Sequence, residues 1–214
     1  MIERRIVMPN TDRRSWLRTL GTADGKTKWS TATPRERIRD RNLPNVELLT
    51  HEGKKVKFYD DLIKDKIVVI NFMYSSCEGI CPTVMMNLAR VHKALGERMG
   101  KDIFFYSLTL KPEQDDPKAL SEYAQMHGGA RAGWYLLTGQ PTNLELLRRK
   151  LGFTDPDPER DRDRTNHIGN LRYGNEELMR WGACPGMSDV DWIVRSILWV
   201  DWPNRAQAGK GGQR

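Results

Sequence analysis

One apolar segment, followed at once by two cysteines and a helical pattern, constrains this chain more than any other feature. Residues 67–74 are apolar at nearly every position, as in a strand that is buried on both faces of a sheet with helices on each side. Cys77 and Cys81 follow, and residues 82–98 have the spacing of a helix. Pro82 suits the first helical position, where its missing N–H would have no partner anyway. The sequence therefore predicts a buried strand that leads into a loop with Cys77 and places Cys81 near the N-cap of a helix.

Two thiols at the start of a helix have two explanations. Unpaired N–H groups and the helix dipole favour anions there, so the thiolate forms more readily, and the thiolate is the form that binds metals or attacks disulfides. Sulfurs at Cys77 and Cys81 can converge on one metal ion or close a disulfide, depending on the loop. Two thiolates suit a soft ion such as Cu(I), but also Zn(II). The other explanation, a pair of buried structural cysteines, is disfavoured because free cysteines are usually scattered.

The distribution of charge limits the classes of partner. The 214 residues are enough for one domain with tails, and their formal net charge is +7. Residues 1–40 hold ten Lys or Arg and five Asp or Glu, a net +5, residues 201–214 hold three and one, a net +2, and residues 41–200 hold twenty-two of each. Because the basic excess lies in the tails, we expect no nucleic-acid-binding face on the core. No apolar run approaches the roughly 18–20 residues that cross a bilayer, so we expect no transmembrane segment.

Both ends of the chain differ from its centre. Residues 1–40 lack a sustained apolar period, so we expect a basic, disordered arm there. Within it, residues 12–18 resemble a twin-arginine export motif, but polar residues follow where such a signal needs an apolar segment. The motif is either an altered signal or a coincidence in an Arg-rich arm. Residues 201–214 are rich in Gly, Lys and Gln, so we expect a mobile basic tail, which leaves residues 41–200 as the folded domain.

The domain alternates strand and helix patterns, which indicates an α/β fold with a partly parallel sheet. A hairpin around Gly174 and Asn175 is expected near the C-terminal end. The remaining expected elements are strands at 46–49, 51–59, 102–110 and 134–138, helices at 118–127, 142–151 and 189–200, a short helical turn at 60–64, and a charged loop at 154–166.

Histidine is the natural further ligand for a metal held by two thiolates. Three of the four histidines, His51, His92 and His127, fall at a turn, on a helix surface and at a helix end, so we expect them to be solvated. His167 stands where the long charged loop meets a strand, the kind of place where loops supply ligands to a rigid scaffold. The pattern alone leaves open whether His167 is a ligand.

Two motifs and one spacing resemble the Sco/SenC family over roughly residues 43–200. Residues 71–82 resemble its strand, polar turn and Cys-x3-Cys-Pro motif, and residues 107–117 resemble its second signature, which ends in an Asp-x-Pro turn before a helix. The family places a ligand histidine about ninety residues beyond the first cysteine, and His167 is ninety beyond Cys77 (167 − 77 = 90). Together these features make His167 the favoured ligand.

The resemblance implies a thioredoxin-like fold, with a central mixed sheet flanked by helices, an N-terminal hairpin and an inserted hairpin near the C-terminus. It implies that Cys77, Cys81 and His167 bind one copper ion per chain, as Cu(I) or Cu(II), and that the two cysteines form a redox-active pair. The implied function is a metallochaperone that delivers copper to the copper-bearing subunit of a respiratory oxidase. A thioredoxin-like reductant would be a second partner, and the expected location is the periplasm or another exported, membrane-associated space.

Some residues depart from the family pattern, and other functions stay open. Lys111 stands where the family often has Asp, and the usual membrane anchor is missing. Cys184 is additional, either as a third sulfur ligand or, more in keeping with free cysteines, as a buried structural thiol. The same thiol pair would serve a thiol–disulfide oxidoreductase that keeps a partner's cysteines reduced, or a copper or redox sensor, so whether the chain is an enzyme is undecided. A peroxidase, for which Thr83 would polarise the peroxide, fits less well.

Overall fold

The computed structural model describes residues 32–163 and 169–202, in which helices and strands alternate as expected. Regular structure begins earlier than predicted, since helix α1 starts at Pro34, within the arm that we expected to be disordered. A capping box formed by Thr33 and Glu36 stabilises the start of this helix. In chain order the elements are α1 (Pro34–Asn42), β1 (Glu47–Thr50), β2 (Lys55–Lys57), η1 (Phe58–Ile63), β3 (Ile67–Met73), α2 (Ile80–Leu95), η2 (Gly96–Arg98), β4 (Ile103–Thr109), α3 (Pro117–His127), β5 (Trp134–Thr138), α4 (Pro141–Lys150), α5 (Pro158–Arg162), β6 (Asn170–Asn175), β7 (Arg180–Pro185) and α6 (Val190–Trp199).

The strands form one mixed sheet in the order β2-β1-β5-β4-β3-β6-β7. Strand β3 pairs in parallel with β4, and β4 pairs in parallel with β5, while the outer pairs are antiparallel. The N-terminal hairpin β1–β2 forms one edge and the hairpin β6–β7 forms the other. The mixed sheet and both hairpins follow the sequence analysis.

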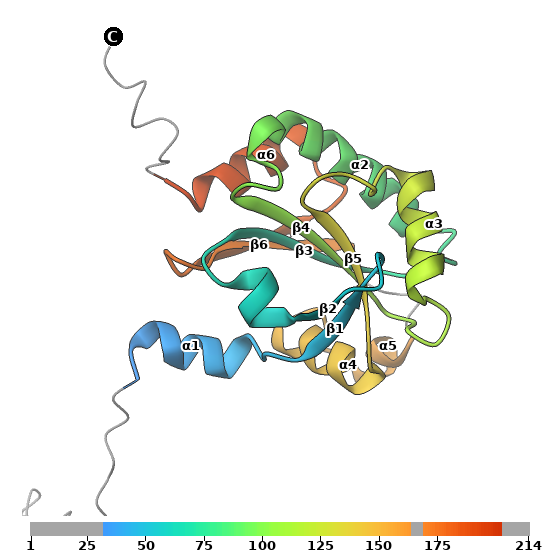
Figure 1. Ribbon diagram of the computed structural model, residues 1–214, viewed down its shortest axis with the longest axis horizontal. Coiled ribbons are helices and arrows are strands. Elements are labelled where there is room, and N and C mark those ends of the chain that lie inside the picture. Colours follow the sequence, from blue (N-terminus) through green and yellow to red (C-terminus); the bar gives the residue numbers. More distant parts are fainter. Residues whose placement is uncertain (1–31, 164–168, 203–214) are drawn as a thin grey trace, which may run out of the picture. The chain divides into compact units, whose positions relative to one another are not determined.

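Helices cover both faces of the sheet, with α2, α3 and α6 on one side and α4 on the other (Figure 1). Every residue of β3 is buried, and its side chains alternate between the two layers. Val69 and Met73 pack into the core that contains α2, α3 and α6, whereas Val68 and Ile70 pack into the core that contains η1 and α4. The central apolar strand is thus buried on both faces because each face has its own helical layer.

Three buried side chains of the central strands, Asn71, Ser107 and Trp134, are joined by hydrogen bonds inside the sheet. The Ser107 hydroxyl donates to Asn71 Oδ1 at 2.7 Å and accepts from Trp134 Nε1 at 3.0 Å. Because these partners lie on the three central strands β3, β4 and β5, the bonds link those strands through their side chains.

The C-terminal hairpin turns later than predicted. Gly174 and Asn175, expected at the turn, belong to β6, and the chain reverses over residues 176–179, with Met179 in the left-handed region at a φ of 53°. A glycine is needed at position 174 for a different reason: the indole ring of Trp181 on β7 packs against its backbone, and a Cβ there would overlap that ring.

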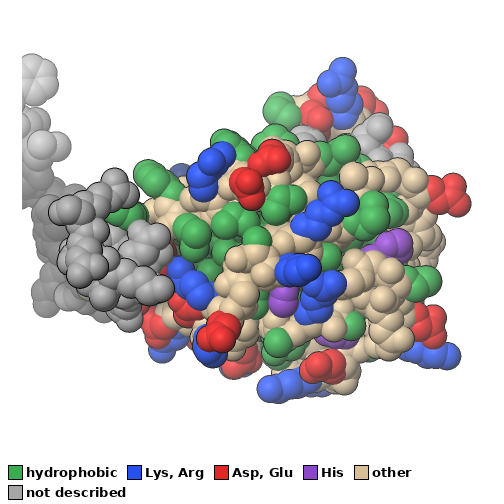
Figure 2. Space-filling model, turned by 90° about the horizontal axis from the view of Figure 1, so that it is seen from above, with side chains coloured by type: hydrophobic (Ala, Val, Ile, Leu, Met, Phe, Trp, Pro, Cys, Tyr) green, Lys and Arg blue, Asp and Glu red, His purple; other side chains and the backbone are tan. Residues whose placement is uncertain are grey.

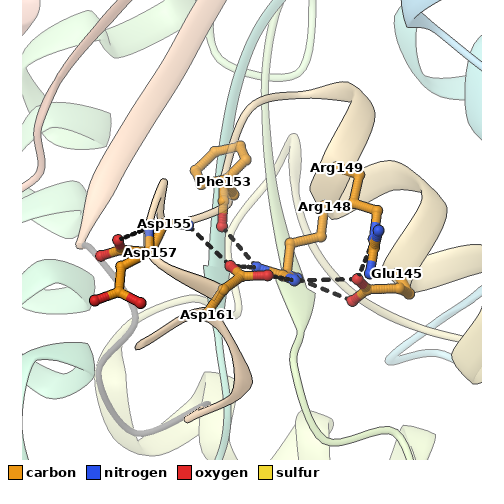
Figure 3. A network of polar contacts seen from close by, with 7 residues as sticks. All are labelled: Glu145, Arg148, Arg149, Phe153, Asp155, Asp157 and Asp161. Atoms are coloured by element: carbon orange, nitrogen blue, oxygen red, sulfur yellow. Dashed lines mark hydrogen bonds and ion pairs between the residues drawn. The ribbon is translucent and has the colours of Figure 1, made fainter. Parts of the chain in front are cut away.

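The charged segment expected as a loop at 154–166 contains helix α5. Arg148 of α4, which is buried, donates to both carboxylate oxygens of Asp161 at 2.6 and 2.7 Å and also bonds Glu145 and the Phe153 carbonyl (Figure 3). The Asp155 N–H donates to the same Asp161 carboxylate at 2.8 Å. This network fixes α5 against α4, so a highly charged stretch takes up regular structure.

Among the described residues, no helix combines the length and apolar character that crossing a membrane requires.

Candidate metal and thiol site

The two cysteines lie where β3 passes into α2, as expected, but the helix begins one residue before Cys81. Gly79 is the N-cap and Ile80 the first helical residue, so Cys81 is second and Pro82 third. Pro82 still lies in the first turn, where backbone N–H groups have no helical partner. The Cys77 N–H donates to the Tyr74 carbonyl at 3.2 Å, which curls the loop back toward β3.

The two thiols are free and buried, but their protonation differs. Burial alone would raise the pKa of Cys77, yet hydrogen bonds from the Cys81 thiol, the N–H groups of Cys81 and Gly79 and the Tyr74 hydroxyl together lower it. Burial raises the pKa of Cys81, and its hydrogen bond to Cys77 raises it further. Cys77 is therefore the thiol that forms a thiolate more readily, and the protonated Cys81 thiol donates a hydrogen bond to it.

Tyr74 joins the loop to a positive charge. Burial, followed by its hydrogen bond to Cys77, raises the pKa of Tyr74 to about 12, so the hydroxyl stays protonated and donates. The Lys111 ammonium lies over the Tyr74 ring, 4.1 Å from its centroid. Lys111, the residue at which the sequence departs from the expected acidic pattern, thus contributes a cation beside the thiol loop.

A buried carboxylate braces the loop from the β4 side. Asp115, fully buried, accepts from the Ser75 N–H at 3.2 Å and from the hydroxyls of Ser75 and Thr109. The Ser76 hydroxyl also reaches Gln114 at 3.3 Å. The motif that contains Asp115 is evident in the sequence, but this role of its carboxylate is not. The signal available there was a polar turn before Cys77 and an Asp-x-Pro turn after the neighbouring parallel strand.

One buried hydroxyl near the thiols has no hydrogen-bond partner among the described residues. The Tyr123 side chain on α3 is 2 % exposed, and its hydroxyl makes no hydrogen bond within the described part of the chain. Burial and then the charges of Cys81, Cys77 and Asp115 raise the pKa of Tyr123, so the hydroxyl remains a neutral donor close to both sulfurs. The two thiols, once deprotonated, suit a soft, thiolate-binding ion, and the Tyr123 hydroxyl is a hydrogen-bond donor beside them.

His167, the favoured third ligand, lies outside the described residues, but both flanks of its segment approach the thiol loop. On one side, the charge of Asp163 contributes to the raised pKa of Tyr74. On the other, Gly169 lies against the first turn of α2, because a Cβ there would overlap the Ile80 side chain. The Gly186 N–H donates to the Gly169 carbonyl at 2.7 Å and fixes this approach.

The other three histidines are not simply solvated, which corrects the prediction. His51 Nδ1 accepts from the Leu136 N–H at 3.2 Å, and His92 Nε2 lies 2.9 Å from the Ala132 carbonyl. The His127 ring contacts the Tyr123 ring in a tilted arrangement, with 4.3 Å between the ring centroids. All three are half-buried and have structural contacts that a sequence pattern could not predict.

Cys184 behaves as the expected structural thiol. It is 3 % exposed on β7 within the core that also contains α2, and burial raises its pKa to about 11. Across residues 32–163 and 169–202, no three or more His, Cys, Asp or Glu side chains cluster so as to hold a metal ion.

Comparison with known proteins gives the same family as the motifs. The SCO1/SenC family model matches residues 37–171. A putative copper-binding protein of Stutzerimonas stutzeri is 28% identical over 135 residues, which is 62% of this chain and 64% of that protein. The SCO1 protein homolog of Bacillus subtilis is 28% identical over 107 residues, 49% of this chain and 54% of that protein. The matched region thus spans between half and two thirds of these relatives.

Solved structures share the fold. A SCO1/SenC family lipoprotein from Bacillus anthracis superposes with a TM-score of 0.61 at 22% identity, covering 74% of this chain and 94% of that one. Arabidopsis thaliana ScoI with copper bound gives 0.57 at 21% identity, covering 73% and 96%. BsSco, described with a disulfide switch and as a member of the Sco family of cytochrome c oxidase assembly proteins, gives 0.59 at 21% identity, covering 73% and 91%. These likenesses confirm the expected thioredoxin-like fold.

Proposed function

Because this chain belongs to the SCO1/SenC family, we propose that it is a copper-binding metallochaperone that holds one copper ion through Cys77, Cys81 and His167. The observation that carries the proposal is a pair of buried thiols, Cys77 in the loop before α2 and Cys81 in its first turn, in which Cys81 donates a hydrogen bond to Cys77. Relatives and structural neighbours named as copper-binding or copper-bound support the choice of metal. The recipient we propose is the copper-bearing subunit of a respiratory oxidase, in line with the oxidase-assembly description of BsSco.

The chemistry of the donors supports copper as the cargo. Two thiolates prefer the soft Cu(I) ion, and an imidazole nitrogen extends the set to Cu(II). The lowered pKa of Cys77 provides one thiolate, while the raised pKa of Cys81 means that metal binding must displace its proton. Copper affinity should therefore rise with pH, because the ligand proton of Cys81 competes with the metal.

The path of the backbone supports His167 as the third ligand. His167 precedes Gly169 by two positions, and two residues span at most about 7 Å. Since Gly169 lies against Ile80, the residue before Cys81, the chain length allows the imidazole to reach the sulfurs.

Titration with Cu(I) and Cu(II), separately, on the reduced protein tests the proposal. We expect one equivalent of each ion, with a thiolate-to-copper charge-transfer band for Cu(II). His167→Ala should lower Cu(II) affinity severely while leaving the Cys77–Cys81 disulfide able to form. Cys184→Ala is the matched control, because it removes a buried thiol that belongs to β7 and not to the loop with Cys77, and it should leave the stoichiometry unchanged. Loss of binding in Cys184→Ala but not in Cys77→Ala would overturn the ligand assignment, and unchanged Cu(II) affinity in His167→Ala would remove the histidine from it.

A second candidate function, thiol–disulfide exchange, is favoured by the direct hydrogen bond between the two sulfurs. The Cys77 thiolate would attack a partner disulfide, form a mixed disulfide and release one partner thiol. Cys81 would then attack the Cys77 sulfur, so that the pair is oxidised to a disulfide and the partner disulfide is reduced by two electrons. A thioredoxin-like reductant would restore the dithiol. In Cys81→Ala the mixed disulfide should accumulate, whereas a chaperone without this activity would show no covalent adduct.

For both functions, the location that we propose for this protein is an exported, oxidising compartment such as the periplasm, where a reversible disulfide can form. A structural neighbour named as a lipoprotein supports this location. Fusion of alkaline phosphatase to the C-terminus tests this location, because that enzyme needs disulfides to be active. An inactive fusion in cells would contradict export.

A further inference from the structure

The hydroxyl of Tyr123 is a buried donor that has no acceptor among the described residues. Its oxygen is shielded from solvent and makes no hydrogen bond within residues 32–163 and 169–202. The view from above looks onto the helical layer of α2, α3 and α6 and shows side chains of every kind covering it (Figure 2). Tyr123 lies beneath this cover. A buried polar group without a partner costs free energy, so a folded protein that keeps one calls for a reason.

Packing alone holds the Tyr123 ring in place. Tyr123 belongs to the same core as Cys77 and Cys81, and its helix, α3, packs against α2. His127, one turn further along α3, contacts the ring with 4.3 Å between the two centroids. The ring therefore needs no hydrogen bond to be positioned, and the hydroxyl stays available for another task.

The hydroxyl lies toward the thiol loop. Side chains of a helix lean toward its N-terminal end, and just before that end of α3 the Asp115 carboxylate accepts from the Ser75 N–H of the loop. Besides burial, the negative charges of Cys81, then Cys77 and then Asp115 raise the pKa of Tyr123. Such an effect requires the hydroxyl to be near these groups, and Cys81 acts on it most strongly.

The two sulfurs differ in the donors that already surround them. Cys77 accepts hydrogen bonds from the Cys81 thiol, the N–H groups of Cys81 and Gly79, and the Tyr74 hydroxyl. Cys81 accepts from the Tyr74 N–H and gives its own proton to the bond with Cys77. Negative charge on Cys77 is therefore well supplied with donors, whereas negative charge on Cys81 needs a further one.

We propose that the Tyr123 hydroxyl donates a hydrogen bond to the Cys81 sulfur when that sulfur carries negative charge. This occurs when Cys81 is a copper ligand, and when it is the leaving group as a dithiol reduces the Cys77–Cys81 disulfide. The inference rests on the function proposed for the thiol pair, but the reduction needs no copper.

The reduction shows where the donor acts. A thiolate of the reductant attacks the Cys77 sulfur, the more exposed of the two, and the S–S bond breaks with its electron pair leaving on Cys81. The Tyr123 hydroxyl stabilises this leaving thiolate, which then takes up a proton. The second thiol of the reductant displaces Cys77 from the mixed disulfide, so the protein gains two electrons and the reductant becomes a disulfide.

Reduction of the oxidised full chain by dithiothreitol tests the donor. Acid quenching, alkylation and mass spectrometry give the rate. In Tyr123→Phe we expect the rate to fall about fivefold to tenfold, because one hydrogen bond to the charged leaving sulfur is lost. The same ratio is expected when both proteins also carry His167→Ala, since the hydroxyl acts on Cys81 directly.

Tyr106→Phe is the matched control. Tyr106 is also fully buried, but it lies in the core that contains η1 and α4, and its hydroxyl donates to the Leu62 carbonyl at 2.7 Å. This variant should be reduced at the parent rate. Its urea midpoint should fall, because a satisfied hydrogen bond is lost, whereas the midpoint of reduced, metal-free Tyr123→Phe should stay the same or rise.

Cu(II) adds a spectroscopic readout. In Tyr123→Phe the thiolate-to-copper charge-transfer band should move to longer wavelength, because loss of the hydrogen bond raises the energy of the sulfur electrons. The band of Tyr106→Phe should stay at the parent position.

Several results would overturn the proposal: an unchanged reduction rate in Tyr123→Phe, an equal fall in Tyr106→Phe, a ratio that disappears with His167→Ala, or a charge-transfer band that does not move. So would a lower urea midpoint in Tyr123→Phe, since the hydroxyl would then have a partner in the dithiol form. Slower reduction of Tyr123→Phe in a protein that binds no copper would support the donor and contradict only the metallochaperone.

Discussion

The Asp115 carboxylate accepts a hydrogen bond from the Ser75 N–H at 3.2 Å, across forty positions of sequence. It thereby ties the loop that carries Cys77 to the segment that follows β4. The hydroxyls of Ser75 and Thr109 donate to the same carboxylate. The thiol loop is therefore fixed by hydrogen bonds to Asp115 as well as by its attachment to β3 and α2. The orientation of Cys77 thus depends on a residue that is neither a thiol nor a proposed metal ligand.

Replacing Asp115 should weaken both the fold and copper binding. In Asp115→Ala three donors lose their acceptor, the buried Thr109 hydroxyl and the half-buried N–H and hydroxyl of Ser75, so we expect the free energy of unfolding to fall by about 2 kcal/mol. Asp115→Asn, which keeps one acceptor oxygen, should lose less. Urea unfolding measures the stability and copper titration the affinity. The exposed Glu113 offers a control, since Glu113→Ala should change stability by no more than about 0.5 kcal/mol. Equal effects of Glu113→Ala and Asp115→Ala would argue against the brace.

Alkylation of the reduced, metal-free protein should distinguish the three cysteines. Cys77 has a lowered pKa, whereas burial raises that of Cys81 and raises that of Cys184 to about 11. At neutral pH iodoacetamide should therefore modify Cys77 first, because the thiolate is the reacting form. Peptide mass spectrometry identifies the modified residue, and the unfolded protein, in which all three should react alike, is the control. First modification at Cys184 would contradict the assignment.

Acid should destabilise the attachment of α1 through Glu176. Burial alone would raise the pKa of this carboxyl, but hydrogen bonds from Arg35 of α1, the Asp65 N–H and the Tyr59 hydroxyl outweigh it and lower the pKa below its ordinary value of 4.5. A carboxyl with a lowered pKa in the folded state stabilises above its ordinary pKa and loses that contribution as pH falls below it.

Unfolding measured between neutral pH and pH ~3 should thus show a steeper loss of stability in the parent than in Glu176→Gln. The variant cannot titrate at this position, so the difference between the two curves isolates Glu176 from the other carboxyls. Parallel curves would show that Glu176 has the same pKa in the folded and unfolded states.

Arg148 should matter more to stability than its neighbour Arg149. Arg148 is 5 % exposed and bonds Asp161, Glu145 and a backbone carbonyl, whereas the side chain of Arg149 is 68 % exposed and bonds only Glu145 among the described residues. Arg148→Met removes the cation that bonds both oxygens of the partly exposed Asp161 carboxylate, while Glu145 keeps its bond to Arg149, so we expect a loss of about 2 kcal/mol, less than a fully buried pair would cost. Arg149→Met should lose at most about 0.5 kcal/mol. Denaturant unfolding of both variants checks the contrast, which similar losses would refute.

Local sequence patterns determined much of this fold. The apolar run at 67–74 predicted the buried strand β3, and the Asp-x-Pro turn at residues 115–117 predicted a helix after it. Helix α3 starts at Pro117, one residue earlier than predicted, and the Asp116 side chain accepts from the Ala119 N–H at 2.8 Å. Such features depend on residues close in sequence, through periodicity and helix capping, so the chain reveals them without its tertiary structure. The cysteine pair at the strand-to-helix junction was evident for the same reason.

Tertiary contacts decided what the patterns could not. The C-terminal hairpin turns after Asn175, because the Trp181 ring needs the space that Gly174 leaves inside the strand. Helix α5 forms in a stretch whose composition favours a loop, because Asp161 finds a buried partner in Arg148. Asp115 braces the thiol loop only after parallel pairing sets β4 beside β3. Each outcome depends on residues that the chain brings together from separate elements, and such a contact has no counterpart in the periodicity of either segment.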